Sequence, residues 1–265
     1  MSKLKDILDQ ILSIEEELLE NKEIDTAHFV FWPLIRLELF WNLQHGITPK
    51  QAASSSYRDH SARLLGDRES GISSCPNASI FILSQFANFK WRTKNDRLYD
   101  IRFGEIIRHL HENNHDFQYF HIHEDGHRST GSGLENDPIS IEFTLENNES
   151  NSNRFPHFDE TWEALSLMRD LANKLLKKEC VGLSMVKTFF SHFGAWSLLL
   201  DSLRPKFVFL DNFYNPVHMA LVFAARKRKI KVIDVAHGTQ GPHHGMYSHW
   251  INPELSGSPI LPDRF

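Results

Sequence analysis

Four histidines fall within thirteen consecutive positions of the segment VIDVAHGTQGPHHGMYSHW, which spans residues 232–250. Histidine titrates near neutral pH and is the commonest metal ligand, so this segment could hold a metal, belong to an active site or form a solvated turn. A tetrahedral zinc site usually takes its ligands at helical or CxxC-type spacing, whereas His243 and His244 are adjacent. The spacing therefore favours contacts to a substrate or to solvent, and it predicts no bound metal. The histidines concerned are His237, His243, His244 and His249.

His237 stands apart because it follows a short, largely apolar run, residues 231–236, of the kind that forms a buried strand. A second run, residues 206–211, ends in Asp211. In open parallel sheets, ligands bind outside the carboxyl ends of the strands. If these two strands are neighbours, four residues converge on one crevice: Asp211, Asn212, Tyr214 and His237. His237 would then act as a general base on a hydroxyl or bind a phosphate, and the alternative is a histidine that only caps a turn.

A second group of histidines and carboxylates lies at the end of another predicted strand. Its members alternate along the chain, which is typical of polar residues at the point where a chain leaves a strand. We therefore expect no set of metal ligands there. The group comprises His121, His123, His127, Glu124 and Asp125.

Composition and charge exclude several functional classes for the 265-residue chain. A net charge of −5 argues against nucleic-acid binding, since such domains are usually strongly basic. Two cysteines, Cys75 and Cys180, provide neither a disulfide framework nor zinc-ligand spacing, which indicates a reducing compartment. No run of about 18 apolar residues is present, so the chain would work at a membrane only peripherally. The basic run at residues 226–229 is interpreted as the solvated end of a helix.

The first fifty residues predict two helices. Apolar residues recur at three- and four-residue spacing over residues 4–18, which predicts an amphipathic helix. The segment FWPLIRLELFWNLQHG, residues 31–46, predicts a second helix with Pro33 in its first turn and Gly46 at its end. This second helix is apolar on most sides and is expected to be buried. Arg36 in its middle would either extend its charge to solvent or pair with a buried acid, and we expect the former.

From residue 79 onward the chain alternates strands and helices, as α/β proteins do. The preceding connector, residues 48–77, is polar with at most one short helix, and residues 123–156 are too polar to bury much surface apart from one short strand. The predicted strands span residues 79–84, 117–122, 139–145, 206–211 and 231–236, a polar loop spans 85–100, and the predicted helices lie near 103–114, 161–178, 181–203 and 216–228. The last two strands are expected to be adjacent and parallel, joined by the last helix. Neither a GxGxxG nor a Walker phosphate loop is present.

Three motifs resemble those of bacterial surface-polysaccharide glycosyltransferases, in the same order along the chain. FWPLIRLELF, residues 31–40, resembles their N-terminal Trp-Pro-Leu-x-Arg helix. FVFLDNFYNPVHMALVFAARKRKIKVIDVAHGTQGPHHGMYSHW, residues 207–250, resembles the segment in which an alanine-rich helix leads to a strand that ends in Ala-His-Gly, followed by Gly-Pro and a tyrosine. LPDRF, residues 261–265, resembles the motif that opens their second domain.

Those enzymes are similar to GT-B proteins, which hold acceptor and nucleotide-sugar on either side of a cleft between two Rossmann-like domains and require no metal. The resemblance implies an α/β fold in which helices flank a Rossmann-like parallel sheet, the N-terminal half of a GT-B fold, with an N-terminal helical extension. It also implies a domain organisation: a helical segment at residues 1–75 that packs on the α/β domain, a Rossmann-like acceptor-side domain at 76–255, and at 256–265 the start of a linker to a donor-binding domain that this sequence lacks.

The function that the resemblance implies is sugar transfer in capsule or lipopolysaccharide synthesis. The donor substrate would be a nucleotide-sugar and the partner a glycan or lipid-linked glycan acceptor, with no cofactor and no nucleic acid. The protein would be located in the cytoplasm, or would associate peripherally with the inner face of the membrane. His237 and Asp211 would be catalytic, and the substrate-binding residues would be Gly238, Gln240, Tyr214, His243 and Tyr247. Two alternatives remain: a non-catalytic α/β module that binds a sugar or a protein and, more remotely, a metal-dependent hydrolase that uses the histidines.

Overall fold

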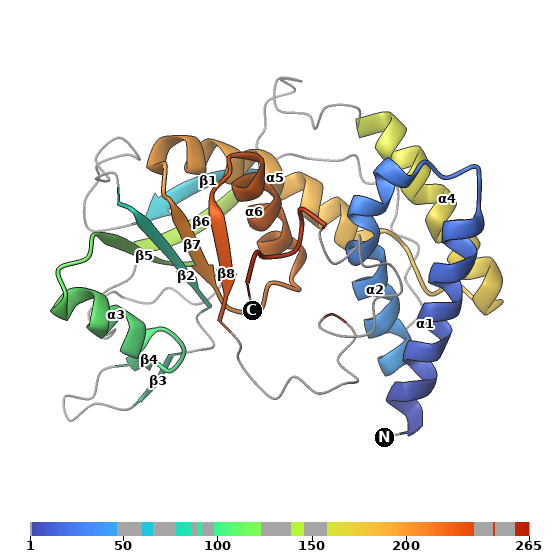
Figure 1. The fold of residues 1–265 in the computed structure, drawn as a ribbon, viewed down its shortest axis with the longest axis horizontal. Coiled ribbons are helices and arrows are strands. Elements are labelled where there is room, and N and C mark those ends of the chain that lie inside the picture. Colours follow the sequence, from blue (N-terminus) through green and yellow to red (C-terminus); the bar gives the residue numbers. More distant parts are fainter. Residues whose placement is uncertain are drawn as a thin grey trace.

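The computed structural model describes residues 2–46, 60–65, 78–85, 89–91, 98–122, 139–145, 158–235, 246 and 258–264. A β-sheet with helices on both faces occupies one end of its long axis, and a group of helices occupies the other (Figure 1).

The main sheet has six strands in the order β1-β6-β5-β2-β7-β8. Five of them, from β6 to β8, run parallel, and β1 pairs antiparallel with β6 at one edge. Numbered along the chain, the parallel strands are arranged 3-2-1-4-5, which is the order of doubly wound Rossmann-like sheets. The expected parallel pairing of β7 with β8, joined by α6, is confirmed. The bounds are β1 His60–Leu65, β2 Ile80–Ser84, β5 Phe117–Ile122, β6 Ile139–Leu145, β7 Phe207–Leu210, β8 Lys231–Asp234 and α6 Pro216–Lys227.

Different helices cover the two faces of the sheet. Alternate residues along a strand point to opposite faces, and the register aligns Ile82 with Tyr119 and Phe209 in one row. This row packs with apolar residues of α3. On the opposite face, the ring of Phe81 stands perpendicular to that of Trp196 in α5, with centroids 6.3 Å apart. The covering helices are α3 (Gly104–Glu112) on one face and α5 (Ser184–Leu203) with α6 on the other.

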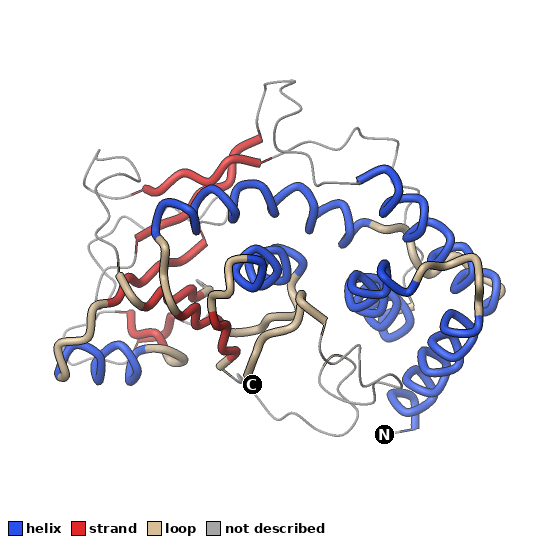
Figure 2. Tube along the Cα trace, turned by 45° about the horizontal axis from the view of Figure 1, so that its top comes forward, coloured by secondary structure: helices blue, strands red, loops and turns tan. Residues whose placement is uncertain are grey.

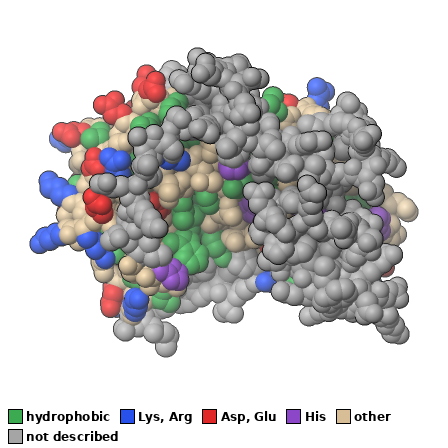
Figure 3. Space-filling model, turned by 180° about the vertical axis from the view of Figure 1, so that it is seen from behind, with side chains coloured by type: hydrophobic (Ala, Val, Ile, Leu, Met, Phe, Trp, Pro, Cys, Tyr) green, Lys and Arg blue, Asp and Glu red, His purple; other side chains and the backbone are tan. Residues whose placement is uncertain are grey.

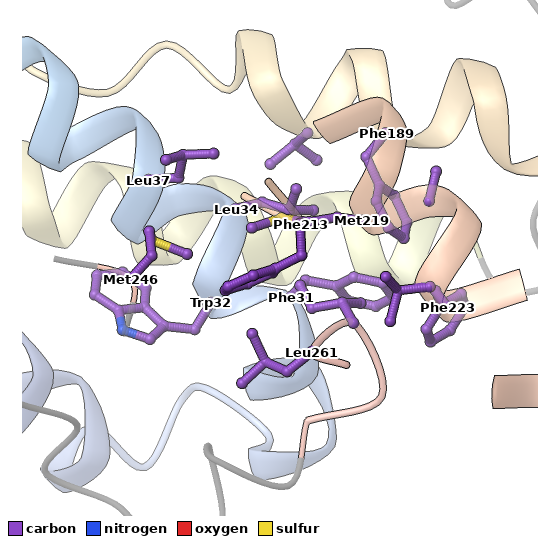
Figure 4. Packing of buried hydrophobic residues seen from close by; sticks show 14 of the residues in the cluster. Phe31, Trp32, Leu34, Leu37, Phe189, Phe213, Met219, Phe223, Met246 and Leu261 are labelled. Carbon is purple, nitrogen blue, oxygen red and sulfur yellow. The ribbon is translucent and has the colours of Figure 1, made fainter. Parts of the chain in front are cut away.

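The helices at the other end share their core with the sheet. The long helix α5 runs from the sheet to these helices (Figure 2). Where they meet, the ring of Phe31 lies 5.8 Å from that of Phe189 in α5 and 5.7 Å from that of Phe223 in α6 (Figure 4). A continuous hydrophobic cluster therefore extends from α1 to the sheet. The helices of this end are α1 (Ser2–Glu20), the 3-10 helix η1 (Thr26–Phe31), α2 (Trp32–His45) and α4 (Phe158–Leu176).

Helix α2 is buried on most sides, as its sequence predicts, and 10 of its 14 residues are buried. Pro33 lies in the first turn, and Gly46 ends the helix with a φ of 66°, a conformation that favours glycine. The expectation for Arg36 is wrong, because its guanidinium is fully buried and pairs with Glu15 of α1 instead of reaching solvent. The same carboxylate accepts a hydrogen bond from Trp32 Nε1 at 2.7 Å. The second interpretation of Arg36, a partner for a buried acid, is therefore the correct one.

Two segments expected to be loops contain strands. β1 lies in the polar connector and is the edge strand of the sheet. Within the loop 85–100, β3 (Phe89–Trp91) pairs antiparallel with β4 (Leu98–Asp100). These three strands are short and mix polar with apolar residues, so none of them has the apolar run that marks a strand buried on both faces. In the polar stretch 123–156, the strand β6 is confirmed, and the residues on either side of it lie outside the described part of the chain.

The basic run 226–229 is engaged in ion pairs and is not simply a solvated helix end. Arg226 Nη1 lies 3.1 Å from Asp263 Oδ1, and Arg228 Nη2 lies 2.7 Å from Asp201 Oδ2. The first pair fastens the C-terminal segment to α6, and the second fastens the end of α6 to the end of α5.

Candidate functional site

The strand order creates a switch in chain direction between β2 and β7, the place where doubly wound sheets bind ligands. From β2 the chain passes through α3 to β5 on one side, and from β7 it passes through α6 to β8 on the other. Ser84 ends β2, and Gln85 Nε2 lies 3.5 Å from the backbone oxygen of Asp211, which follows β7. We call the polar side chains at this carboxyl edge the switch-point site. Its members are Ser84, Asp100, Arg102, Asp211, Tyr214 and Asp234.

Asp100 ties the loop before α3 to the ends of two strands. Its Oδ2 accepts hydrogen bonds from Ser84 Oγ at 2.5 Å and from Tyr119 OH at 2.6 Å. Its Oδ1 accepts from the backbone N–H groups of Arg102 and Phe103, at 2.7 and 2.9 Å. Four donors thus satisfy the buried carboxylate of Asp100, whose exposed fraction is 3%. Burial, followed by the charge of Asp100, raises the pKa of Tyr119, so this phenol remains a hydrogen-bond donor.

Asp211, Tyr214 and Asp234 gather at the same edge. Both carboxylates are buried, with exposed fractions of 2% for Asp211 and 1% for Asp234. Burial first, and then the charges of Asp234 and Asp211, raises the pKa of Tyr214 to about 12, while the Arg102 guanidinium acts in the opposite direction. Tyr214 is therefore protonated at neutral pH and can donate a hydrogen bond. The structure thus brings together the predicted site residues Asp211 and Tyr214, and it adds Asp234.

The loop that carries Asp211 and Tyr214 is fixed at both ends. Asn215 caps α6, since its Oδ1 accepts from Val217 N at 2.9 Å, and Pro216 occupies the first turn. The buried His218 donates from Nδ1 to the backbone oxygen of Asn212 at 3.1 Å. A rigid loop places its functional side chains with little conformational freedom, which a binding site requires.

The other predicted site residues lie outside the described part of the chain. They are His237, Gly238, Gln240, His243 and Tyr247, together with His244 and His249. The chain enters their segment beside the switch-point site, because the N–H of Val235 donates to Leu210 O at 2.7 Å at the end of β7.

Within the described residues, no three His, Cys, Asp or Glu side chains are placed to hold a metal ion. The histidines at 237–249 are not among these residues, so the absence of a metal there stays a prediction. Of the second histidine group, only His121 is described, and it is buried near the end of β5, level with Ser84.

In the described part of the chain, every helix is too short or too polar to cross a bilayer.

On the back face, acidic and basic side chains gather over the end that holds α1 and α4, and an area of hydrophobic side chains lies beside them (Figure 3). Peripheral association with a membrane stays a prediction.

The switch-point site suits a ligand with several hydroxyl groups. The carboxylates of Asp211 and Asp234 are acceptors for hydroxyl donors, and the protonated phenol of Tyr214 is a donor. Sequence reasoning did not identify Ser84, Asp100, Arg102, Asp234 or His218. Ser84 and Asp234 could have been found from the criterion that selected Asp211, because each ends a short apolar strand.

Comparisons of the chain with protein-family models, with curated proteins and with solved structures give no match.

Proposed function

We propose that this chain is the acceptor-side, Rossmann-like domain of a GT-B-type glycosyltransferase for capsule or lipopolysaccharide synthesis. The observation that carries the proposal is the gathering of Asp211, Asp234 and Tyr214 at the switch point of a doubly wound sheet. Two of the motifs that resemble surface-polysaccharide glycosyltransferases lie largely on described elements: the first falls mostly in α2 at the helical end, and the second includes β7, α6 and β8, which border the switch point.

In this function the switch-point site holds the glycan acceptor. Asp211 and Asp234 accept hydrogen bonds from sugar hydroxyls, and Tyr214 donates one to a ring or hydroxyl oxygen. Gly238, Gln240, His243 and Tyr247 contact the substrates. The donor is a nucleotide-sugar, and neither a metal nor a cofactor takes part.

His237 is the general base of the proposed transfer. It takes the proton from an acceptor hydroxyl, and the oxygen forms a bond with the anomeric carbon of the donor sugar. The bond from that carbon to the nucleoside diphosphate breaks, and the leaving phosphate keeps the electron pair. Asp211 orients the imidazole or the attacking hydroxyl. Removal of a general base lowers the rate by roughly 10²-fold or more.

The first test is glycan binding by the purified chain and its Asp211→Asn variant. The substitution keeps the shape of the side chain but removes the charged acceptor, so we expect affinity for a bound glycan to fall about tenfold or more. Asp201→Asn is the control, because Asp201 is an exposed aspartate with a side chain that is 62% exposed, far from the switch point on α5.

Titration calorimetry of the three proteins against oligosaccharides from an acidic and neutral glycan panel gives the affinities. Equal affinity in Asp211→Asn and the unmodified chain would place glycan binding elsewhere and overturn the proposal. In an enzyme that also contains the donor-binding domain, His237→Ala should lower the release of nucleoside diphosphate from a nucleotide-sugar by roughly 10²-fold or more without lowering the melting temperature.

A further inference from the structure

Arg102 has a fixed place at the switch-point site. It lies in the turn between β4 and α3, and its backbone N–H is bound by Asp100 Oδ1 at 2.7 Å. The other oxygen of Asp100 is bound by Ser84 Oγ at the end of β2. The Arg102 backbone is therefore anchored to the strand that borders the switch point, while its side chain takes no part in that anchor.

The guanidinium of Arg102 lacks the bonds that other shielded arginines make. Its Nε is covered from solvent, and among the described residues it has no hydrogen-bond partner and no ion pair. Arg36, Arg226 and Arg228 are each paired with a carboxylate. Arg102 as a whole is only partly buried, but a shielded N–H without an acceptor costs free energy, so this side chain is suited to an anion that a ligand brings.

The surrounding charges select the kind of anion. Arg102 is close enough to Tyr214 to oppose the effects of Asp234 and Asp211 on that phenol. One cation and two buried carboxylates therefore share the surroundings of the Tyr214 phenol. A doubly charged phosphate would be repelled by both, whereas a carboxylate carries one charge and matches the planar guanidinium with two parallel hydrogen bonds. The neighbouring carboxylates remain acceptors for hydroxyl groups.

We propose that Arg102 is a ligand-binding residue that pairs with the carboxylate of an acidic sugar, such as a hexuronic acid, in the bound glycan. This assignment rests on the proposed function and specifies its acceptor class: the Arg102 guanidinium holds the carboxylate, and Asp211 accepts from a hydroxyl of the same or the adjoining sugar.

Matched oligosaccharide pairs test the assignment. Each pair consists of a uronate-containing tetrasaccharide and its carboxyl-reduced, neutral counterpart, titrated against the unmodified chain, Arg102→Gln and Arg108→Gln. The unmodified chain should prefer the acidic member by about tenfold or more, and Arg102→Gln should remove this preference. Arg108 is an exposed arginine of α3 with a side chain that is 64% exposed, and its replacement should change neither affinity.

Arg102→Gln keeps the backbone N–H that Asp100 binds, so its melting temperature should match that of the unmodified chain. Arg102→Lys should retain part of the preference, since it keeps the charge but loses the planar fork. The assignment would be overturned by an acidic preference that survives Arg102→Gln, or by an unmodified chain that binds both members equally. In either case, the glycan affinity of Asp211→Asn would still test the proposed function. Inorganic phosphate that displaces the uronate with higher affinity would overturn the carboxylate class, and a chain that binds no oligosaccharide would overturn both proposals.

Discussion

His218 lies in the first turn of α6, and its Nδ1–H donates to the backbone oxygen of Asn212. Asn212 has a φ of 59°, a left-handed conformation that asparagine tolerates better than most residues. Burial lowers the pKa of His218, although the nearby Asp211 carboxylate acts to raise it. The neutral imidazole therefore holds the loop from which Asp211 and Tyr214 project.

The neutral state of His218 makes its contribution to stability dependent on pH. In the unfolded chain the imidazole takes up a proton near its ordinary pKa of about 6.5, whereas in the folded chain it does so only at lower pH. Its stabilising effect is thus present above about pH 6.5 and is lost as the pH falls through the lowered folded pKa. We expect the loss of unfolding free energy in His218→Asn to be largest near about pH 8 and to shrink toward about pH 5, measured by urea denaturation.

His115→Asn, which replaces an exposed histidine after α3, is the control for this series. A loss in His218→Asn that instead grows on acidification would mean that the imidazolium pairs with Asp211 in the folded chain.

The residues of the site differ in how well the sequence reveals them. Asp211 was identified because it directly ends an apolar run, so its place at a carboxyl edge follows from one strand alone. Asp100 was missed because its partners Ser84 and Tyr119 are 16 and 19 residues away, and only the fold brings them together. Arg36 was assigned the wrong environment because its partner, Glu15, lies on another helix.

At the scale of elements, the loop from β4 to α3 depends on Asp100. Asp100→Ala removes the acceptor of four hydrogen bonds, two of them from backbone N–H groups, and each hydrogen bond contributes a net stabilisation of about 0.5–1.5 kcal/mol. We expect a loss of roughly 3 kcal/mol or more in unfolding free energy, and faster amide exchange at Arg102 and Phe103.

Asp100→Asn should lose less, because its remaining carbonyl oxygen can still accept from the two backbone N–H groups. Asp116→Ala, at an exposed aspartate just before β5, provides the comparison. Unchanged exchange at Arg102 and Phe103 in Asp100→Ala would show that the loop is held by other contacts.

The elements that the sequence predicts best are the largely apolar strands and the helices that connect them. β2, β5, β7 and β8 are short apolar runs, and the helices between them repeat at helical spacing, so local pattern and final fold agree. β1, β3 and β4 lack that pattern and form because a partner strand is available. The order of strands in the sheet could not be predicted, since nothing in the run at 80–84 indicates that β2 pairs with both β5 and β7.

At the scale of the whole molecule, the pair of Glu15 and Arg36 joins the first two helices in the interior. Arg36→Ala leaves the Glu15 carboxylate buried without its cation, which typically destabilises a protein by about 3–5 kcal/mol. The double variant Glu15→Gln with Arg36→Met removes both charges and keeps an acceptor for Trp32 Nε1. We expect it to regain at least half of the lost unfolding free energy in urea denaturation.

The exposed pair of Arg108 and Glu105 on α3 offers a matched comparison. Arg108→Ala should leave the unfolding free energy almost unchanged, because a solvated ion pair contributes little. A double variant at Glu15 and Arg36 that is no more stable than Arg36→Ala alone would mean that the arginine acts by filling space and not by its charge.

The central place of β2 in the sheet has a consequence for the chain as it leaves the ribosome. Its partner β5 follows soon after it, but β7 on its other side begins more than a hundred residues later. At a synthesis rate of about 5–20 residues per second, that edge stays open for on the order of ten seconds. Throughout this interval the backbone donors and acceptors of β2 beside Phe81 and Leu83 are a template for any extended segment nearby. The order of translation therefore exposes the strand that borders the switch point to mispairing, until the arrival of β7 closes the edge.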